Sequence, residues 1–248
     1  MVTTLPFDSA LLDRLLDEAG IDVLLATSKH NTQYLLGGYR FFFFDAMDAI
    51  GQSRYLPVVA YPRGGAERTG YVGHPMEKYE QELGRFWPPH LLLKGRSSRE
   101  SVALAAEHVA RLGLGAGRIG VEMDFLPADA LDALRSALPA ATFVDALVPL
   151  ERLRARKRPD ELRLLREASE RVIAAMLAVI EGHGPGTTKR QLVDALRREE
   201  VARGLTFDYC LITAGSSLNR APSDQRWEVG DILSLDSGGN YEGYIGDV

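Results

Sequence analysis

The chain has 248 residues, of which 46% are hydrophobic and 25% are charged, a composition typical of a globular protein with one large or two ordinary domains. Its net charge of −5 argues against nucleic acid as a partner. The single cysteine, Cys210, excludes a disulfide framework. No apolar run approaches the roughly 20 residues that span a bilayer, and the N-terminus lacks a signal-peptide pattern. We therefore expect a cytoplasmic protein without a membrane partner.

The first 150 residues alternate between helical and extended patterns. Apolar residues recur at helical spacing in three segments, whereas short apolar runs between polar or glycine residues predict strands. The predicted helices are residues 8–20, 99–112 and 127–138, and the predicted strands are residues 21–26, 55–61, 69–72, 119–121 and 141–144. This alternation predicts an α/β domain with a mixed sheet.

Four segments of this domain have less regular patterns. Lys29–Asn31 is predicted to be a polar break after the first strand. The aromatic run Phe41–Phe44 is compatible with a membrane-contacting patch, but it is short and lacks a basic flank, so a core strand is favoured. Pro57 predicts a strand at a sheet edge or an irregular strand start. The two prolines in Phe86–His90 predict a stiff loop, either a pocket cover or, as we favour, a packing corner.

A basic segment marks the expected domain boundary at about residue 155. Residues 151–159 contain five arginine or lysine residues and precede an acidic helix start, a pattern that favours a solvated linker over a nucleic-acid site. After it, residues 159–181 and 189–203 have helical spacing, and Thr187 and Thr188 are candidate caps of the second helix. Residues 206–213 are predicted to form a strand.

The last eighteen residues, 231–248, have the pattern of a β-hairpin. An apolar run ends on Asp236, a Gly/Asn cluster follows at residues 238–240, and a second apolar stretch leads to Asp247. If the turn is centred between Tyr241 and Glu242, the two aspartates lie directly opposite one another. Two adjacent carboxylates repel, and a pair of bound cations would remove that cost. The alternative is that both are solvated turn aspartates.

The residues of this hairpin carry a resemblance to a known family. Gly230-Asp231, then Asp236-Ser237-Gly238, then Gly243-Tyr244 and Asp247 resemble the first metal-binding hairpin of the pita-bread metallohydrolases, which include Xaa-Pro aminopeptidase, prolidase and creatinase. The resemblance implies that Asp236 and Asp247 bind a dinuclear metal centre, which a histidine and two glutamates from later strands complete. The sequence stops one residue after Asp247, so those three ligands cannot be placed.

A weaker motif, residues 31–35 followed by Gly37, resembles the N-terminal domain of the creatinase and aminopeptidase P group. The segment before the hairpin resembles one that carries a histidine in the peptidases, but here Asn219 and Arg220 stand there and no histidine follows His183. Arginine stays protonated and can hold a carboxylate, so we expect Arg220, with Asn219, to contact a substrate that has an anionic group. The alternative for Arg220 is a surface ion pair with Asp224.

The resemblance implies a creatinase-like α/β domain over residues 1–155 and an incomplete α+β pita-bread domain over residues 156–248. It further implies two divalent ions (Mn, Co, Fe or Zn), hydrolysis of a C–N bond in an Xaa-Pro peptide or creatine-like amide, a small-molecule or short-peptide substrate, and a homodimer. We expect the chain alone to be inactive. The alternatives are a non-catalytic dimerisation module, or a family member with a lyase or amidinohydrolase reaction. Cys210 and His183 are expected to be a packing residue and a solvated loop residue.

Overall fold

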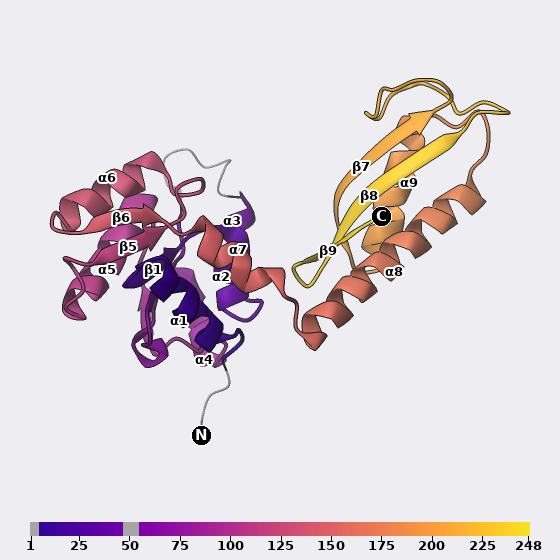
Figure 1. Cartoon of the computed structure of the whole chain (residues 1–248). Helices are drawn as coiled ribbons and strands as arrows, with labels where there is room; N and C mark the ends of the chain where they lie inside the picture. The colour runs from indigo at the N-terminus through magenta and orange to yellow at the C-terminus, as the bar shows by residue number, and fades with distance from the viewer. Residues whose placement is uncertain (1–4, 47–54) are drawn as a thin grey trace. The chain divides into compact units, whose positions relative to one another are not determined.

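The computed structural model describes residues 5–46 and 55–248. The chain divides into two compact units, Met1–Arg156 and Lys157–Val248, each with its own sheet and helices (Figure 1). The described part of the chain contains no helix with the length and apolar character needed to cross a membrane.

The first unit is built on a mixed sheet, as the sequence predicts, and the sheet has six strands in the described residues. The strand order is β4-β3-β2-β1-β5-β6, with antiparallel pairing of β1 with β2 and of β2 with β3, and parallel pairing elsewhere. The strands are β1 (Val23–Ala26), β2 (Val58–Pro62), β3 (Gly70–Gly73), β4 (His90–Leu93), β5 (Arg118–Val121) and β6 (Thr142–Asp145).

Helices cover both faces of this sheet (Figure 1). Alternation along β1 sends Leu24 into an apolar cluster with α1 and α7, and sends Leu25 into a second cluster with α5 and α6. The helices of the unit are α1 (Ser9–Glu18), α2 (Lys29–Leu35), α3 (Phe43–Ala46), α4 (Lys78–Glu82), α5 (Ser98–Arg111), α6 (Ala128–Ala137) and α7 (Leu147–Ala155), with 3₁₀ turns at Ala66–Arg68 and Pro75–Glu77.

The predicted polar break at Lys29–Asn31 is wrong, because these residues begin α2. Ser28 caps the helix by accepting from the Asn31 amide at 3.2 Å. The buried carboxylate of Glu122 accepts from the backbone N–H of Ser28 at 2.9 Å and from the Asn31 side chain at 2.6 Å. Glu122 lies far away in sequence, so this stabilisation has no local signal.

The predicted strand at Phe41–Phe44 is also wrong. Phe44 donates its N–H to the Phe41 carbonyl at 2.9 Å, and α3 begins at Phe43. Phe41 and Phe44 are buried beside Tyr55, whereas Phe42 is 63% exposed. Residues three apart lie on the same side of a helical turn. A run of four phenylalanines has no apolar periodicity, so the sequence does not distinguish this turn from a strand. Phe41 and Phe44 are therefore core residues, as expected, whereas Phe42 is not.

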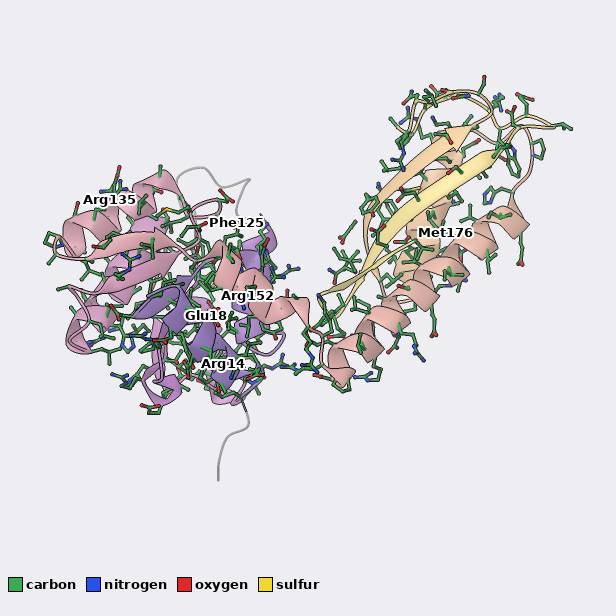
Figure 2. The ribbon with its side chains drawn as sticks, in the orientation of Figure 1. Arg14, Glu18, Phe125, Arg135, Arg152 and Met176 are labelled. Carbon is green, nitrogen blue, oxygen red and sulfur yellow. The ribbon has the colours of Figure 1, made fainter. Side chains whose placement is uncertain are left out.

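Two smaller predictions change in the same unit. Strand β2 is internal, so Pro57 marks the start of a strand and not a sheet edge. The segment predicted as a solvated linker is helical as far as Ala155, and Arg152 on α7 pairs with Glu18 on α1 at 2.6 Å (Figure 2). The Phe86–His90 loop is a packing corner, where Trp87 donates to the Leu35 carbonyl at 2.6 Å.

The second unit packs two helices on a three-stranded antiparallel sheet of order β7-β8-β9. Helix α8 contacts β8 and β9, and α9 contacts β7. Apolar side chains between these layers form the core, with Met176 of α8 half-buried at its margin (Figure 2). The elements are α8 (Pro159–Gly182), α9 (Lys189–Ala202), β7 (Thr206–Ala214), β8 (Leu233–Tyr241) and β9 (Tyr244–Asp247).

Candidate metal centre

A two-residue turn joins β8 to β9 and determines which residues face one another. Tyr241 pairs with Tyr244, so the turn consists of Glu242 and Gly243, both with positive φ (52° and 87°). Positive φ at both central residues is the type I′ geometry, whose twist matches that of antiparallel strands. The Gly/Asn cluster at residues 238–240, predicted as the turn, lies inside β8.

The expected register of the aspartates is wrong by two residues. Asp247 lies opposite Gly238, and Asp236 lies opposite Leu211 of β7. The aspartates are therefore diagonal neighbours on adjacent strands, with a separation of about 7–8 Å between such positions. The two carboxylates are therefore further apart than the directly opposite pair that the sequence predicts.

Both aspartates lie on the face of the sheet that points away from α8 and α9. Ser237 and Gly239 face the helices, since the Ser237 hydroxyl contacts Glu200 of α9 and an added Cβ at Gly239 would meet Val172 of α8 at 2.9 Å. Alternation places Asp236 on the opposite face, and the pairing with Gly238 places Asp247 there too. Asp236 is half-buried and Asp247 is exposed, so both carboxylates are open to solvent ions.

Arg220 lies beside this pair of aspartates. Its guanidinium forms an ion pair with Asp236 Oδ2. The predicted alternative, an ion pair with Asp224, is wrong because Asp224 pairs with Arg190 at 3.3 Å. The Arg220 carbonyl accepts from the Ile212 amide at 2.9 Å, so the loop that carries Arg220 is tied to β7.

Asn219 is placed differently from its neighbour. Its carbonyl accepts from Lys189 Nζ at 2.5 Å, and its own side-chain oxygen accepts from the Ala221 amide at 2.9 Å. Lys189 is fully buried in the first turn of α9. The Asn219 amide is therefore engaged within its loop, and the structure brings Arg220, but not Asn219, into contact with an aspartate.

Tyr209 is a site residue that the sequence analysis missed. Its ring contacts Gly238, where a Cβ would clash with it, and its hydroxyl donates to Asp247 Oδ1 at 2.5 Å. This hydrogen bond to a carboxylate raises the pKa of Tyr209 to about 12. Residues 206–213 were predicted as a strand, but the sequence does not show that Tyr209 pairs with Gly238. That register is needed to predict the contact between Tyr209 and Asp247.

The donor chemistry fits part of a divalent metal site. Carboxylate oxygens suit the harder transition metals, and Asp236 Oδ1 is the oxygen not used by Arg220. Within residues 5–46 and 55–248, no three His, Cys, Asp or Glu side chains are grouped closely enough to hold an ion. Asp236 and Asp247 therefore do not form a complete metal site by themselves, and their role as ligands stays a prediction.

The other two candidates are structural. Cys210 is buried against the helices, and burial raises the pKa of its thiol to about 11, which disfavours the reactive thiolate. His183 follows the end of α8, where its Nδ1 lies 2.9 Å from the Val179 carbonyl. Cys210 is a packing residue, as predicted, and the His183 ring contacts a backbone carbonyl in the last turn of α8.

Two family models match the chain along most of its length. The Creatinase/Prolidase N-terminal domain matches residues 10–156, and Metallopeptidase family M24 matches residues 163–248.

A curated relative is the uncharacterized peptidase YqhT of Bacillus subtilis, 24% identical over 96% of this chain and 62% of its own length. Similar solved structures include an Xaa-Pro dipeptidase from Bacillus anthracis (22% identity, TM-score 0.79) and the dipeptidase PepE from Mycobacterium ulcerans (25% identity, TM-score 0.70). Each aligns over 96% of this chain and 62% of the known structure. The chain therefore spans less than two thirds of these relatives.

Proposed function

Because the chain belongs to the creatinase/prolidase family and continues into a metallopeptidase M24 segment, we propose that its whole protein is a dinuclear metal-dependent hydrolase of C–N bonds. The observation that supports this most is the placement of Asp236 and Asp247 on the open face of one sheet, diagonal to each other. The chain spans 62% of the length of its curated relative. We expect the chain alone to bind metal weakly and to be inactive.

In this proposal Asp236 and Asp247 hold two divalent ions together with ligands supplied outside these residues. Bound Mn, Co, Fe or Zn would acidify a water molecule and polarise the substrate carbonyl. Tyr209 orients the Asp247 carboxylate through its hydroxyl, which leaves Oδ2 of that carboxylate for an ion. Arg220 occupies Oδ2 of Asp236 through its ion pair, which leaves Oδ1 of that carboxylate for an ion.

The position of Arg220 supports a substrate with an anionic group. A guanidinium that reaches a metal ligand is close enough to the reaction centre to bind a carboxylate of a short peptide or small amide. We propose Arg220 as the substrate contact and Asn219 as a residue that shapes its loop through the Ala221 and Lys189 hydrogen bonds. Hydrolysis of prolyl dipeptides, compared with creatine-like amides and lyase substrates, would identify the reaction.

The test is metal content after dialysis, measured by elemental analysis on this chain and on a form with the length of its relatives. We expect nearly two ions in the long form and almost none in the chain of 248 residues. In the long form, Asp236→Asn should remove at least one ion, whereas Asp224→Asn, outside the aspartate pair, should remove none. Unchanged stoichiometry in Asp236→Asn would refute the assignment.

A second candidate, dimerisation, is favoured by one observation. Helix α8 exposes Ile173 (42%), Leu177 (53%) and Ile180 (45%) along one side at helical spacing. A second copy of the chain would bury these side chains. Sedimentation velocity tests this proposal. The unmodified chain should sediment as a dimer and Leu177→Glu as a monomer. A monomeric unmodified chain would exclude dimerisation. We propose a homodimer in the cytoplasm as the working state.

A further inference from the structure

A buried glutamate lies directly behind the candidate metal centre. Glu200 on α9 is fully buried, and its Oε1 lies 2.8 Å from the hydroxyl of Ser237 on β8. Its Oε2 is buried and has no hydrogen-bond partner in the described residues. A buried carboxylate with an unpaired oxygen is costly, so the ionised form fits this position poorly.

The hydrogen count around Ser237 identifies which group donates. Ser237 Oγ lies 2.8 Å from Glu200 Oε1 and also 2.8 Å from the backbone carbonyl of Tyr209. A carbonyl can only accept, and a serine hydroxyl has a single proton. If Ser237 donates to Tyr209, the proton between Ser237 and Glu200 must come from the glutamate.

The surroundings favour the neutral acid. Burial raises the pKa of Glu200, the Ser237 hydrogen bond acts in the opposite direction, and the negative charge of Asp208 on β7 raises it further. A Cβ at Gly239 of β8 would meet Glu200 Oε2, Leu205 and Val172 of α8, each at 2.9 Å, and the Glu200 charge acts on the Cys210 thiol of β7.

The neighbouring cations are engaged elsewhere. Arg203, one turn further along the chain, pairs with Glu199, and Arg171 of α8 pairs with Glu167 at 2.6 Å. Neither ion pair includes Glu200, so these guanidinium groups do not compensate a buried charge there.

We propose that Glu200 is a positioning residue that stays a carboxylic acid in the folded chain and donates its proton to Ser237. Ser237 precedes Gly238 and follows Asp236, and it passes the hydrogen bond to Tyr209, whose hydroxyl holds Asp247. One buried acid thereby fixes the backbone beneath both aspartates. The positioning role rests on the proposed metal centre, whereas the protonation state of Glu200 does not.

The first experiment observes the proton directly. Isotope-edited infrared spectra of the chain labelled with ¹³C-carboxyl glutamate, at about pH 6, should contain a protonated carboxyl band, although exposed glutamates ionise near pH 4.3. Glu200→Gln should remove the band, and Glu199→Gln, at the adjacent half-buried residue that pairs with Arg203, should retain it. Absence of the band from the unmodified chain would overturn the proposal even if the variant failed to fold.

The second experiment follows stability against pH. Because the pKa of Glu200 is raised in the fold, its contribution is fully present below the unfolded pKa and is lost as pH rises towards the folded pKa. The unfolding equilibrium constant should rise by up to about tenfold per pH unit in that window. Glu200→Gln should not show this rise, and Glu199→Gln should. A Glu200→Gln curve parallel to that of the unmodified chain would contradict the proposal.

Positioning is tested by hydrogen exchange in the hairpin. The amides of Ser237 and Val248 each donate to the carbonyl of the other residue, at 3.0 and 3.2 Å. Glu200→Gln, which keeps a donor for Ser237, should retain their protection, and Glu200→Ala should lose at least tenfold. Equal protection in both variants would exclude the positioning role. These measurements need no metal, so a metal-free long form would refute the proposed function alone.

Discussion

Glu122 of the first unit and Glu200 of the second are both fully buried, but their carboxyl groups have opposite surroundings. In the first unit, whose sheet is covered by helices on both faces, the buried Glu122 accepts from the amides of Thr27 and Ser28 and from Asn31. In the second unit, Glu200 has one neighbour for Oε1 and none for Oε2 within the described residues. A fully bonded carboxylate is stable as an ion, whereas a poorly bonded one favours its acid form.

The difference extends to the sheets. In the first unit both faces of the sheet are covered by apolar side chains. In the second unit α8 and α9 cover one face, and the other carries Asp236, Asp247 and Tyr209. The first unit is organised for stability, and the second keeps one face available for ligands.

The largest effect is expected at the contact between β9 and α8. A Cβ on Gly246 would lie 2.5 Å from the backbone carbon of Ala168 and the nitrogen of Ser169. A helix backbone cannot yield as a side chain can, so Gly246→Ala should destabilise the second unit by about 3 kcal/mol.

Each unit has one tryptophan, Trp87 or Trp227, so single-tryptophan variants report the two transitions separately. Only the Trp227 transition should shift in urea. Gly184→Ala, with no atom within 4 Å of the added carbon, is the matched control. Equal shifts of both transitions would show that the units unfold together.

The next effect compares the same substitution in both units. Glu122→Gln places an amide donor against other donors and should cost the first unit about 2–3 kcal/mol. Glu200→Gln, by contrast, should be neutral or stabilising near neutral pH. Urea unfolding measures both, with the exposed Asp124→Asn as control. Similar losses at the two positions would remove the distinction between the ionised and the protonated carboxyl.

The units should also respond to pH in opposite directions. Burial lowers the pKa of His108, whose Nε2 lies 2.9 Å from the Arg68 carbonyl. A depressed histidine pKa contributes stability above the unfolded pKa that is lost as pH falls through the folded pKa, an effect of about 1.4 kcal/mol per pH unit at most. Below about pH 6.5 the Trp87 transition should therefore weaken, and His108→Gln should reduce this slope. If the pH dependence of unfolding is the same in His108→Gln, groups other than His108 cause it.

The smallest effect concerns Arg220. Its exposed ion pair with Asp236 is worth about 0–1 kcal/mol. Arg220→Ala should therefore strengthen Mn²⁺ binding by the isolated chain by no more than about fivefold, which calorimetry can measure. Arg190→Ala, which removes the pairing partner of Asp224, should have no effect. Weaker binding in Arg220→Ala would indicate that the arginine organises Asp236 and does not compete for it.

Local patterns in the sequence predict most of the fold. The helices at α1, α5, α6, α8 and α9 have apolar spacing and clear ends, and the mixed sheet follows from their alternation with strands. Helices α4 and α7 and strand β4 were not predicted, and α2 and α3 were predicted wrongly. There, the deciding contacts come from Glu122 and from the packing of Phe41 and Phe44 on Tyr55, which are distant in sequence.

The site shows the same division. The motif identified Asp236 and Asp247, but their register depended on the turn, and Asn240 and Gly243 both offered turn chemistry. In the structure, Asn240 accepts from the Gly243 amide at 2.9 Å and remains in β8. Tyr209 and Glu200 became visible only when strand pairing and helix packing were known, because neither has a distinctive neighbour in sequence.

The Glu242–Gly243 turn also limits how this hairpin can change in evolution. One inserted residue would rotate Asp247 to the helix-covered side, where Gly246 already allows no side chain. Two inserted residues would keep Asp247 on its side but move it along the strand by one pleat repeat. Only insertions of an even number of residues are therefore compatible with this face of the sheet. Such an insertion would change the distance between the two aspartates although both residues are kept.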